Sequence, residues 1–106
     1  MMQANAAEVK KVIEILTMLR DEVMLNNLKG NGTIKEAKSK LQAILNDEEN
    51  RYVAIQAPEE DVVAIEDAKL NALFEAIGFL GESMTYPKQI VKNIDNAVMK
   101  LKKCID

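Results

Sequence analysis

The chain has 106 residues, of which 48% are hydrophobic and 29% charged, with a net charge of −3 and no histidine. This length suits one domain with its own hydrophobic core, so we expect residues 1–106 to form a single unit. The weakly acidic balance argues against a general nucleic-acid binder. The lack of histidine excludes zinc sites of the usual cysteine and histidine kind, and no apolar run is long enough to cross a bilayer.

The cysteine content indicates the cellular compartment, and the charge distribution indicates how the helices attract one another. Cys104 is the single cysteine and cannot form an internal disulfide, and no N-terminal segment has the order of a signal peptide. We therefore predict a cytoplasmic protein without membrane insertion. Residues 47–82 carry ten acidic and two basic side chains, whereas both flanking segments are basic. Such a distribution is expected if the helices of a bundle attract one another.

The first predicted helix covers about residues 6–28. Asn5 and Glu8 have the spacing of a capping box, which predicts the start of this helix. Its apolar stripe recurs at helical spacing and contains Val9, Val12, Ile13, Leu16, Leu19 and Val23. Ile15, Met18 and Leu25 widen the apolar surface beyond what one bundle seam requires. We therefore interpret them as candidate interface residues.

A second helix is predicted over about residues 34–56. Gly30 and the Asn31-Gly32 pair favour a turn before it, and Thr33 has the position of its cap. The buried stripe is predicted to contain Ile34, Ala37, Leu41, Ile44 and Leu45. Five polar residues at 46–50 interrupt this stripe. Both a bent helix and a break near 46–50 are consistent with that interruption.

The third predicted helix, about residues 59–80, is the one with two apolar faces. It follows Pro58 and is expected to end at Gly81. Its broad core stripe contains Val62, Val63, Leu70, Leu73, Phe74, Ile77 and Leu80. A separate row at every fourth residue contains Ala64, Ala68, Ala72 and Ala76, with Phe79 beside it. Small side chains allow close helix packing, so we expect contacts with at least two neighbours. The strip left for water contains Asp67, Asn71, Glu75 and Gly78.

The last predicted helix covers about residues 87–105 and begins at Pro87. Its apolar stripe contains Ile90, Val91, Ile94, Val98, Leu101 and Ile105. Four helices joined by short links favour antiparallel neighbours. The sequence therefore predicts an all-α protein, an antiparallel up-and-down four-helix bundle in which the second helix is continuous, bent or broken.

Few residues suit catalysis or metal binding. Helical bundles bind metals through carboxylates that include pairs three residues apart, and no two acidic residues here are separated by three or four positions. Glu66 falls within the apolar sector of the third helix, where a buried or a functional carboxylate are both conceivable. Cys104 lacks any histidine partner and is expected to be an inert thiol. We predict no catalytic residue, no metal site and no cofactor.

The leading functional hypothesis is a small non-catalytic interaction protein, acting as an adaptor, an inhibitor or immunity factor, or a small subunit, and associating as a homodimer. The surplus of apolar surface motivates it, because such patches mark interfaces. The candidate interface residues are Ala64, Ala68, Ala72, Ala76, Phe79, Ile15, Met18 and Leu25.

Two other classes of function stay open. A nucleic-acid-associated subunit would use lysines of the second and fourth helices as phosphate contacts, namely Lys35, Lys38, Lys88 and Lys92. A metal-dependent carboxylate enzyme would require Glu48, Glu49, Glu66 or Glu75 to converge in one pocket.

Overall fold

The computed structural model describes residues 1–26, 31–54 and 60–105, and within them only the backbone of residues 25–26, 51–54 and 60–66. These ranges form four α-helices: α1 (Gln3–Asn26), α2 (Asn31–Ala54), α3 (Glu60–Thr85) and α4 (Ile90–Ile105). A 3₁₀ turn, η1 (Pro87–Gln89), precedes α4, and the described ranges contain no strand. None of these helices has both the length and the hydrophobicity needed to cross a membrane.

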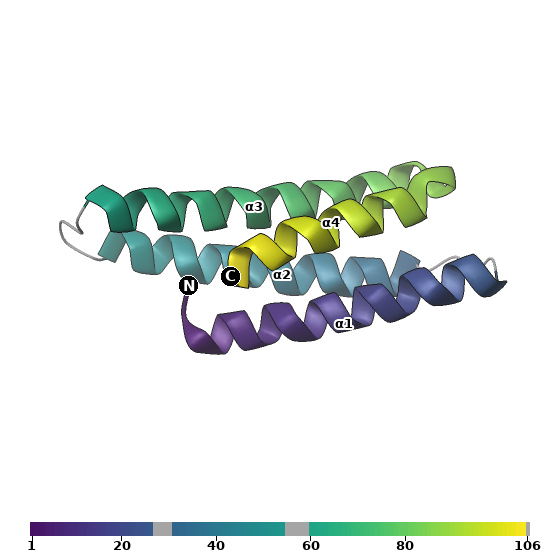
Figure 1. Cartoon of the computed structure of the whole chain (residues 1–106), viewed down its shortest axis with the longest axis horizontal. Helices are drawn as coiled ribbons and strands as arrows, with labels where there is room; N and C mark the ends of the chain where they lie inside the picture. Colours follow the sequence, from purple (N-terminus) through teal and green to yellow (C-terminus); the bar gives the residue numbers. More distant parts are fainter. Residues whose placement is uncertain (27–30, 55–59, 106) are drawn as a thin grey trace.

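The four helices form an elongated bundle with extents of 50 × 22 × 20 Å. Consecutive helices run in opposite directions, with α1 and α3 at opposite edges of the view and α2 behind α4 (Figure 1). α3 packs against α2 and α4, and α1 packs against α4 and α2, whereas no Cα atoms of the described parts of α2 and α4 lie within 8 Å of each other. The predicted up-and-down four-helix bundle is confirmed, with α2 and α4 diagonal to each other.

One hydrophobic core runs along the bundle. The core stripes predicted for α1 and α2 are confirmed: all of their members are buried except Ile13, which packs against the core from its edge. The fully buried large side chains come from all four helices and include Leu16, Ile34, Leu41, Leu73, Leu80, Ile94 and Leu101. Each helix therefore contributes a continuous apolar stripe, as amphipathic packing requires.

Among the side chains that the structure describes, the core stripe predicted for α3 is wrong at one position, while the side chains of Val62 and Val63 lie outside the described part. Leu73, Ile77 and Leu80 are buried, but the side chain of Phe74 is 67% exposed. At 100° per residue, Phe74 lies about 130° from the centre of the buried arc, which also includes Ala72 and Ala76. The apolar sector of α3 was broad enough to fit two orientations, and the helix adopts the one that turns Phe74 toward solvent. The strip predicted to face water is exposed throughout.

The alanine row of α3 is divided between the interior and the surface. Ala72 and Ala76 are buried, whereas Ala68 is exposed. A row at every fourth residue rotates by about 40° per step, so its members cannot all face one neighbour. The Cys104 thiol in the last turn of α4 also contacts the Lys69 carbonyl at 3.4 Å, which places the end of α4 at the level of Ala68. The expectation that α3 touches two neighbours is confirmed.

The polar run at 46–50 does not break α2, which is continuous from Asn31 to Ala54. The stripe continues through Glu48, a carboxylate that is buried against the first turn of α1. Its Oε1 accepts hydrogen bonds from the backbone N–H of Met2 at 2.9 Å and from the Asn5 amide at 2.7 Å. Asn5 also donates to Asp47 at 2.9 Å. A buried carboxylate with such partners is tolerated in a helix face, so the polar run holds α1 and α2 together.

The caps predicted for the first two helices are wrong. α1 begins at Gln3, so Asn5 lies within the helix and uses its side chain to reach α2 rather than to cap. α2 begins at Asn31, so Asn31 and Gly32 are part of the helix instead of a turn, and Thr33 follows them in its first turn. Gly30 and the predicted joint at 57–58 lie outside the described residues.

α3 continues past Gly81, where it was predicted to end. Ser83 is buried and its hydroxyl donates to the Leu80 carbonyl at 2.7 Å, and the Tyr86 N–H closes the last turn on the Glu82 carbonyl at 2.8 Å. The core face extends to Ser83, so tertiary packing offsets the roughly 1 kcal/mol by which glycine disfavours a helix. The prediction for Pro87 is confirmed in part, because it begins η1 and the α-helix follows from Ile90.

The buried face of α4 is rotated slightly from its predicted stripe. Ile90, Ile94 and Leu101 are buried as expected, whereas Val91, Val98 and Ile105 flank the core and are only partly buried. Their places in the interior are taken by Asn93, Ala97 and Cys104. The Asn93 amide nitrogen is buried and has no hydrogen-bond partner among the described residues. An unpaired buried amide destabilises the folded state by about 1–3 kcal/mol.

We expect Asn93→Leu to raise the free energy of unfolding by about 1 kcal/mol, because leucine replaces the unpaired amide with apolar atoms of similar volume. Urea denaturation followed by circular dichroism measures the change. Asn96→Leu on the same helix is a suitable control, since Asn96 is only half-buried and a smaller change is expected there. A clear loss of stability in Asn93→Leu would show that the amide is satisfied in solution.

Candidate interaction surface

The outer side of α1 carries exposed apolar side chains. Ile15 is 37% exposed and Met18 is 64% exposed. Together with Leu19 and Glu22 of α1 and Thr33 of α2, they line a surface groove with a volume of about 210 Å³. We call this the α1 groove. Its lining is mostly apolar, and it lies along the seam where the end of α1 meets the start of α2.

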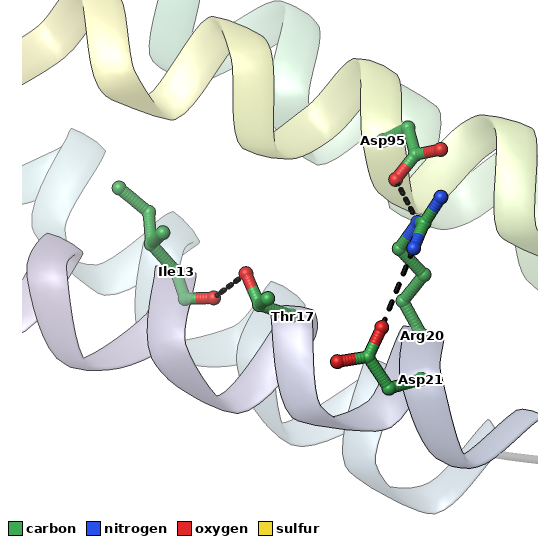
Figure 2. Close-up of polar contacts among 5 residues, drawn as sticks. All are labelled: Ile13, Thr17, Arg20, Asp21 and Asp95. Carbon is green, nitrogen blue, oxygen red and sulfur yellow. Dashed lines mark hydrogen bonds and ion pairs between the residues drawn. The ribbon is translucent and has the colours of Figure 1, made fainter.

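The groove is open because α1 packs more extensively on α4 than on α2. Arg20 reaches from α1 to form an ion pair with Asp95 of α4, and its Nη1 lies 3.3 Å from the carboxylate of Asp21 (Figure 2). The hydrogen bond and the charge of Asp95 raise the pKa of Arg20. This pair joins α1 to α4 on one side of the helix. Ile15 and Met18 consequently remain on the other side, next to solvent.

The structure separates the residues predicted for the interface. Ile15 and Met18 are exposed, as a binding surface requires. Ala72 and Ala76 lie in the core, Phe79 is half-buried against it, and Ala68 is exposed beside the end of α4. The side chains of Ala64 and Leu25 lie outside the described part of the structure. The alanine row therefore serves mainly the packing of α3, and the α1 groove is the part of the predicted interface that faces outward.

Other apolar side chains, which the sequence did not assign to the interface, are exposed as well. Phe74 was expected in the core, and Met24, Met99, Tyr86 and Met2 are also 44–60% exposed. Phe74 has a usable signal in the sequence, since it lies beside Asp67, Asn71 and Gly78 on the helical wheel. Methionines carry no such signal because they fit cores and binding surfaces equally well.

Comparison with protein-family models, with curated proteins and with solved structures gives no significant match. The surface and its chemistry are therefore the basis for assigning a function.

The lysines predicted as phosphate contacts lie on α2, η1 and α4. Lys35 is exposed and Lys38 half-buried on α2, while Lys88 is exposed in η1 and Lys92 is exposed in the first turn of α4. Because the described parts of α2 and α4 are diagonal and not neighbours in the bundle, these lysines do not form one stripe across two adjacent helices. Lys35 and Lys38 instead line a hollow of about 370 Å³ with Ser39, Gln42 and Met84.

The carboxylates considered for a metal site are dispersed. Glu48 is bonded to the start of α1, and Glu75 forms an ion pair with Lys100 of α4 at 2.6 Å. Glu49 is exposed, and the side chain of Glu66 lies outside the described residues. Among the described residues, no group of three acidic or cysteine side chains has the spacing needed to hold a metal ion.

Cys104 is buried in the interface between α4 and α3. Its thiol donates to the carbonyl oxygens of Lys69 at 3.4 Å and Lys100 at 3.5 Å. Burial raises the pKa of this thiol to about 11, an effect that the charge of Lys69 only partly opposes. Since the thiolate is the reactive form, the environment of Cys104 suppresses its reactivity.

We expect Cys104 in the folded protein to react with iodoacetamide at pH 8 at least about a hundredfold more slowly than in the urea-unfolded chain, because two pKa units reduce the thiolate fraction by that factor. Mass spectrometry of timed samples measures the labelling. Comparable rates in both states would show that the end of α4 opens readily and exposes the thiol.

Proposed function

We propose that this protein is a non-catalytic interaction module that binds another protein through the α1 groove, as an adaptor, an inhibitor or immunity factor, or a small subunit. The observation that carries the proposal is the exposure of Ile15 and Met18 over an apolar depression on the outside of the bundle. Exposed apolar patches of this kind mark interaction sites. A cytoplasmic setting is part of the proposal, since the single cysteine suits a reducing compartment.

Helix-in-groove recognition is the mode that this surface suits. A partner helix lying along the seam of α1 and α2 would cover Ile15, Met18 and Leu19 with its own apolar face. Fully burying a methionine or isoleucine side chain contributes about 1.5–3 kcal/mol, so these residues alone support only weak binding. We therefore expect the partner to contact the charged rim as well, which includes Glu22.

Nucleic-acid binding has weaker support. The lysines that it would use are divided between α2 and the diagonal segment formed by η1 and α4, and Lys100 of α4 is already paired with Glu75. A binding surface for phosphates would need these charges gathered on one side.

The experiment is a tagged pull-down from cells of the native host, at low and high salt, with wild type, Met18→Glu and Met99→Glu. Met99 is the matched control because it is 50% exposed on α4, away from the α1 groove. We expect a specific protein, or untagged copies of this chain, to be retained at high salt by wild type and Met99→Glu but not by Met18→Glu. Equal retention by all three variants, or recovery of nucleic acid that high salt removes, would contradict the proposal.

A further inference from the structure

The exposed strip of α1 contains two charges placed at equal distances from its apolar centre. Lys11, Ile15, Met18 and Glu22 are all exposed, and their spacing of four, three and four residues keeps them within a sector of about 60°. This is the spacing of a coiled-coil seam. The side chains of α1 that enter the core lie on a different sector, so the strip stays exposed, beside the start of α2 at Thr33. α1 itself lies along one edge of the bundle (Figure 1).

The strip is complementary to itself when reversed. Read along α1, it is basic, apolar, apolar and acidic, and read backwards it is acidic, apolar, apolar and basic. A two-fold axis midway between Ile15 and Met18 would place Ile15 of one copy opposite Met18 of the other. The same axis would place Lys11 of each copy opposite Glu22 of the other. The two resulting pairs would lie about 16 Å apart along the helix, at 1.5 Å per residue. A symmetric dimer requires this kind of self-complementary patch.

The contacts that the strip makes within its own chain are compatible with this arrangement. Lys11 pairs with Glu8 of its own helix at 3.2 Å, and both side chains are well exposed, at 67% and 46%. Exposed pairs of this kind contribute little and exchange readily with another partner. A parallel arrangement would instead place Lys11 near Lys11 and Glu22 near Glu22, so the charges select the antiparallel one.

We propose that two copies of this chain associate through α1 in an antiparallel, two-fold-symmetric pair, with Ile15 and Met18 at the centre and a Lys11–Glu22 ion pair at each end. The inference rests on the proposed function and names a second copy as the partner of the α1 groove. The apolar centre supplies the association, while the charges set its register.

Charge exchange tests both the partner and the register. In Lys11→Glu every inter-copy pair becomes Glu opposite Glu, and in Glu22→Lys every pair becomes Lys opposite Lys. When the two variants are mixed, each pair joins opposite charges again. We expect wild type to form a dimer in sedimentation equilibrium at low salt and each variant alone to dissociate at least about tenfold more readily. The equimolar mixture, and the Lys11→Glu/Glu22→Lys double variant, should regain wild-type association.

Circular dichroism of each variant confirms that the fold is retained, and Met99→Glu should dimerise as wild type does. A wild-type protein that stays monomeric at roughly millimolar concentration overturns the inference. Variants that dimerise as tightly as wild type, or a mixture that fails to recover association, also overturn it. The dimer and the proposed function can fail independently. If the protein is monomeric and Met18→Glu abolishes its retention of a different protein, the dimer is refuted and the proposed function is not.

Discussion

Leu73→Ala is expected to lower the free energy of unfolding by about 2–5 kcal/mol, whereas Phe74→Ala, one residue further along α3, should change it by less than about 1 kcal/mol. Leu73 is fully buried, so truncation removes apolar contacts and leaves a cavity. Phe74 is the larger side chain but is 67% exposed, so its loss creates no cavity. Urea denaturation of both variants measures the difference.

This pair of substitutions tests the orientation of α3 in the bundle. The two residues share the same helix and the same level along it, so differences in helix propensity contribute only a few tenths of a kcal/mol. A larger loss in Phe74→Ala than in Leu73→Ala would mean that the helix is rotated toward the orientation expected from the sequence. In that orientation Phe74 would lie in the core and not on the surface.

Ala76→Leu is expected to destabilise the protein by about 1–3 kcal/mol, because added methylenes in a packed interior force side chains and backbones apart. Ala76 is fully buried in α3. Thermal unfolding followed by circular dichroism measures the loss as a lower melting temperature. A domain of this size shifts by about 4–8 °C for each kcal/mol.

Ala68→Leu is the matched control for that substitution. It adds the same side chain two turns earlier in the same alanine row, but Ala68 is exposed, so we expect a change within about 0.5 kcal/mol. Equal destabilisation of both variants would point to an effect on the helix itself. An unchanged melting temperature in Ala76→Leu would show that the interior has room for larger side chains.

The helices and most of the core could be predicted from the sequence because their apolar stripes are narrow. In α1 and α2 one sector collects most of the large apolar residues, so only one orientation buries them together. In α3 the apolar residues cover two sectors, and the sequence could not decide whether Phe74 or Ala76 faces inward. The orientation depends on the positions of α2 and α4, which are set by the whole bundle.

The errors at helix ends have a similar origin. Asn5 and Gly81 carry local signals for a helix start and a helix end, but both lie inside helices. Asn5 gains hydrogen bonds to Asp47 and Glu48, which are far away in sequence. α3 continues past Gly81 because Ser83 is buried within the bundle. Contacts with distant segments thus outweigh local preferences of about 1 kcal/mol.

The candidate site was only partly predictable. Ile15 and Met18 were identified because they exceed the needs of one seam, and both are exposed. The alanine row was assigned to the interface as well, although Ala72 and Ala76 are used inside the bundle. Small side chains permit close packing against any neighbour, within the chain or outside it. The groove itself could not be predicted, since it depends on α1 packing more extensively against α4 than against α2.

The most direct test of protein binding through the α1 groove is photocrosslinking in the native host with a photoreactive amino acid at position 18, and at position 99 as the control. We expect position 18 to yield a defined crosslinked protein, either a second copy of this chain or another protein, and we expect Ile15→Glu to abolish that product. No product at position 18, or the same products from positions 18 and 99, would contradict the proposed function.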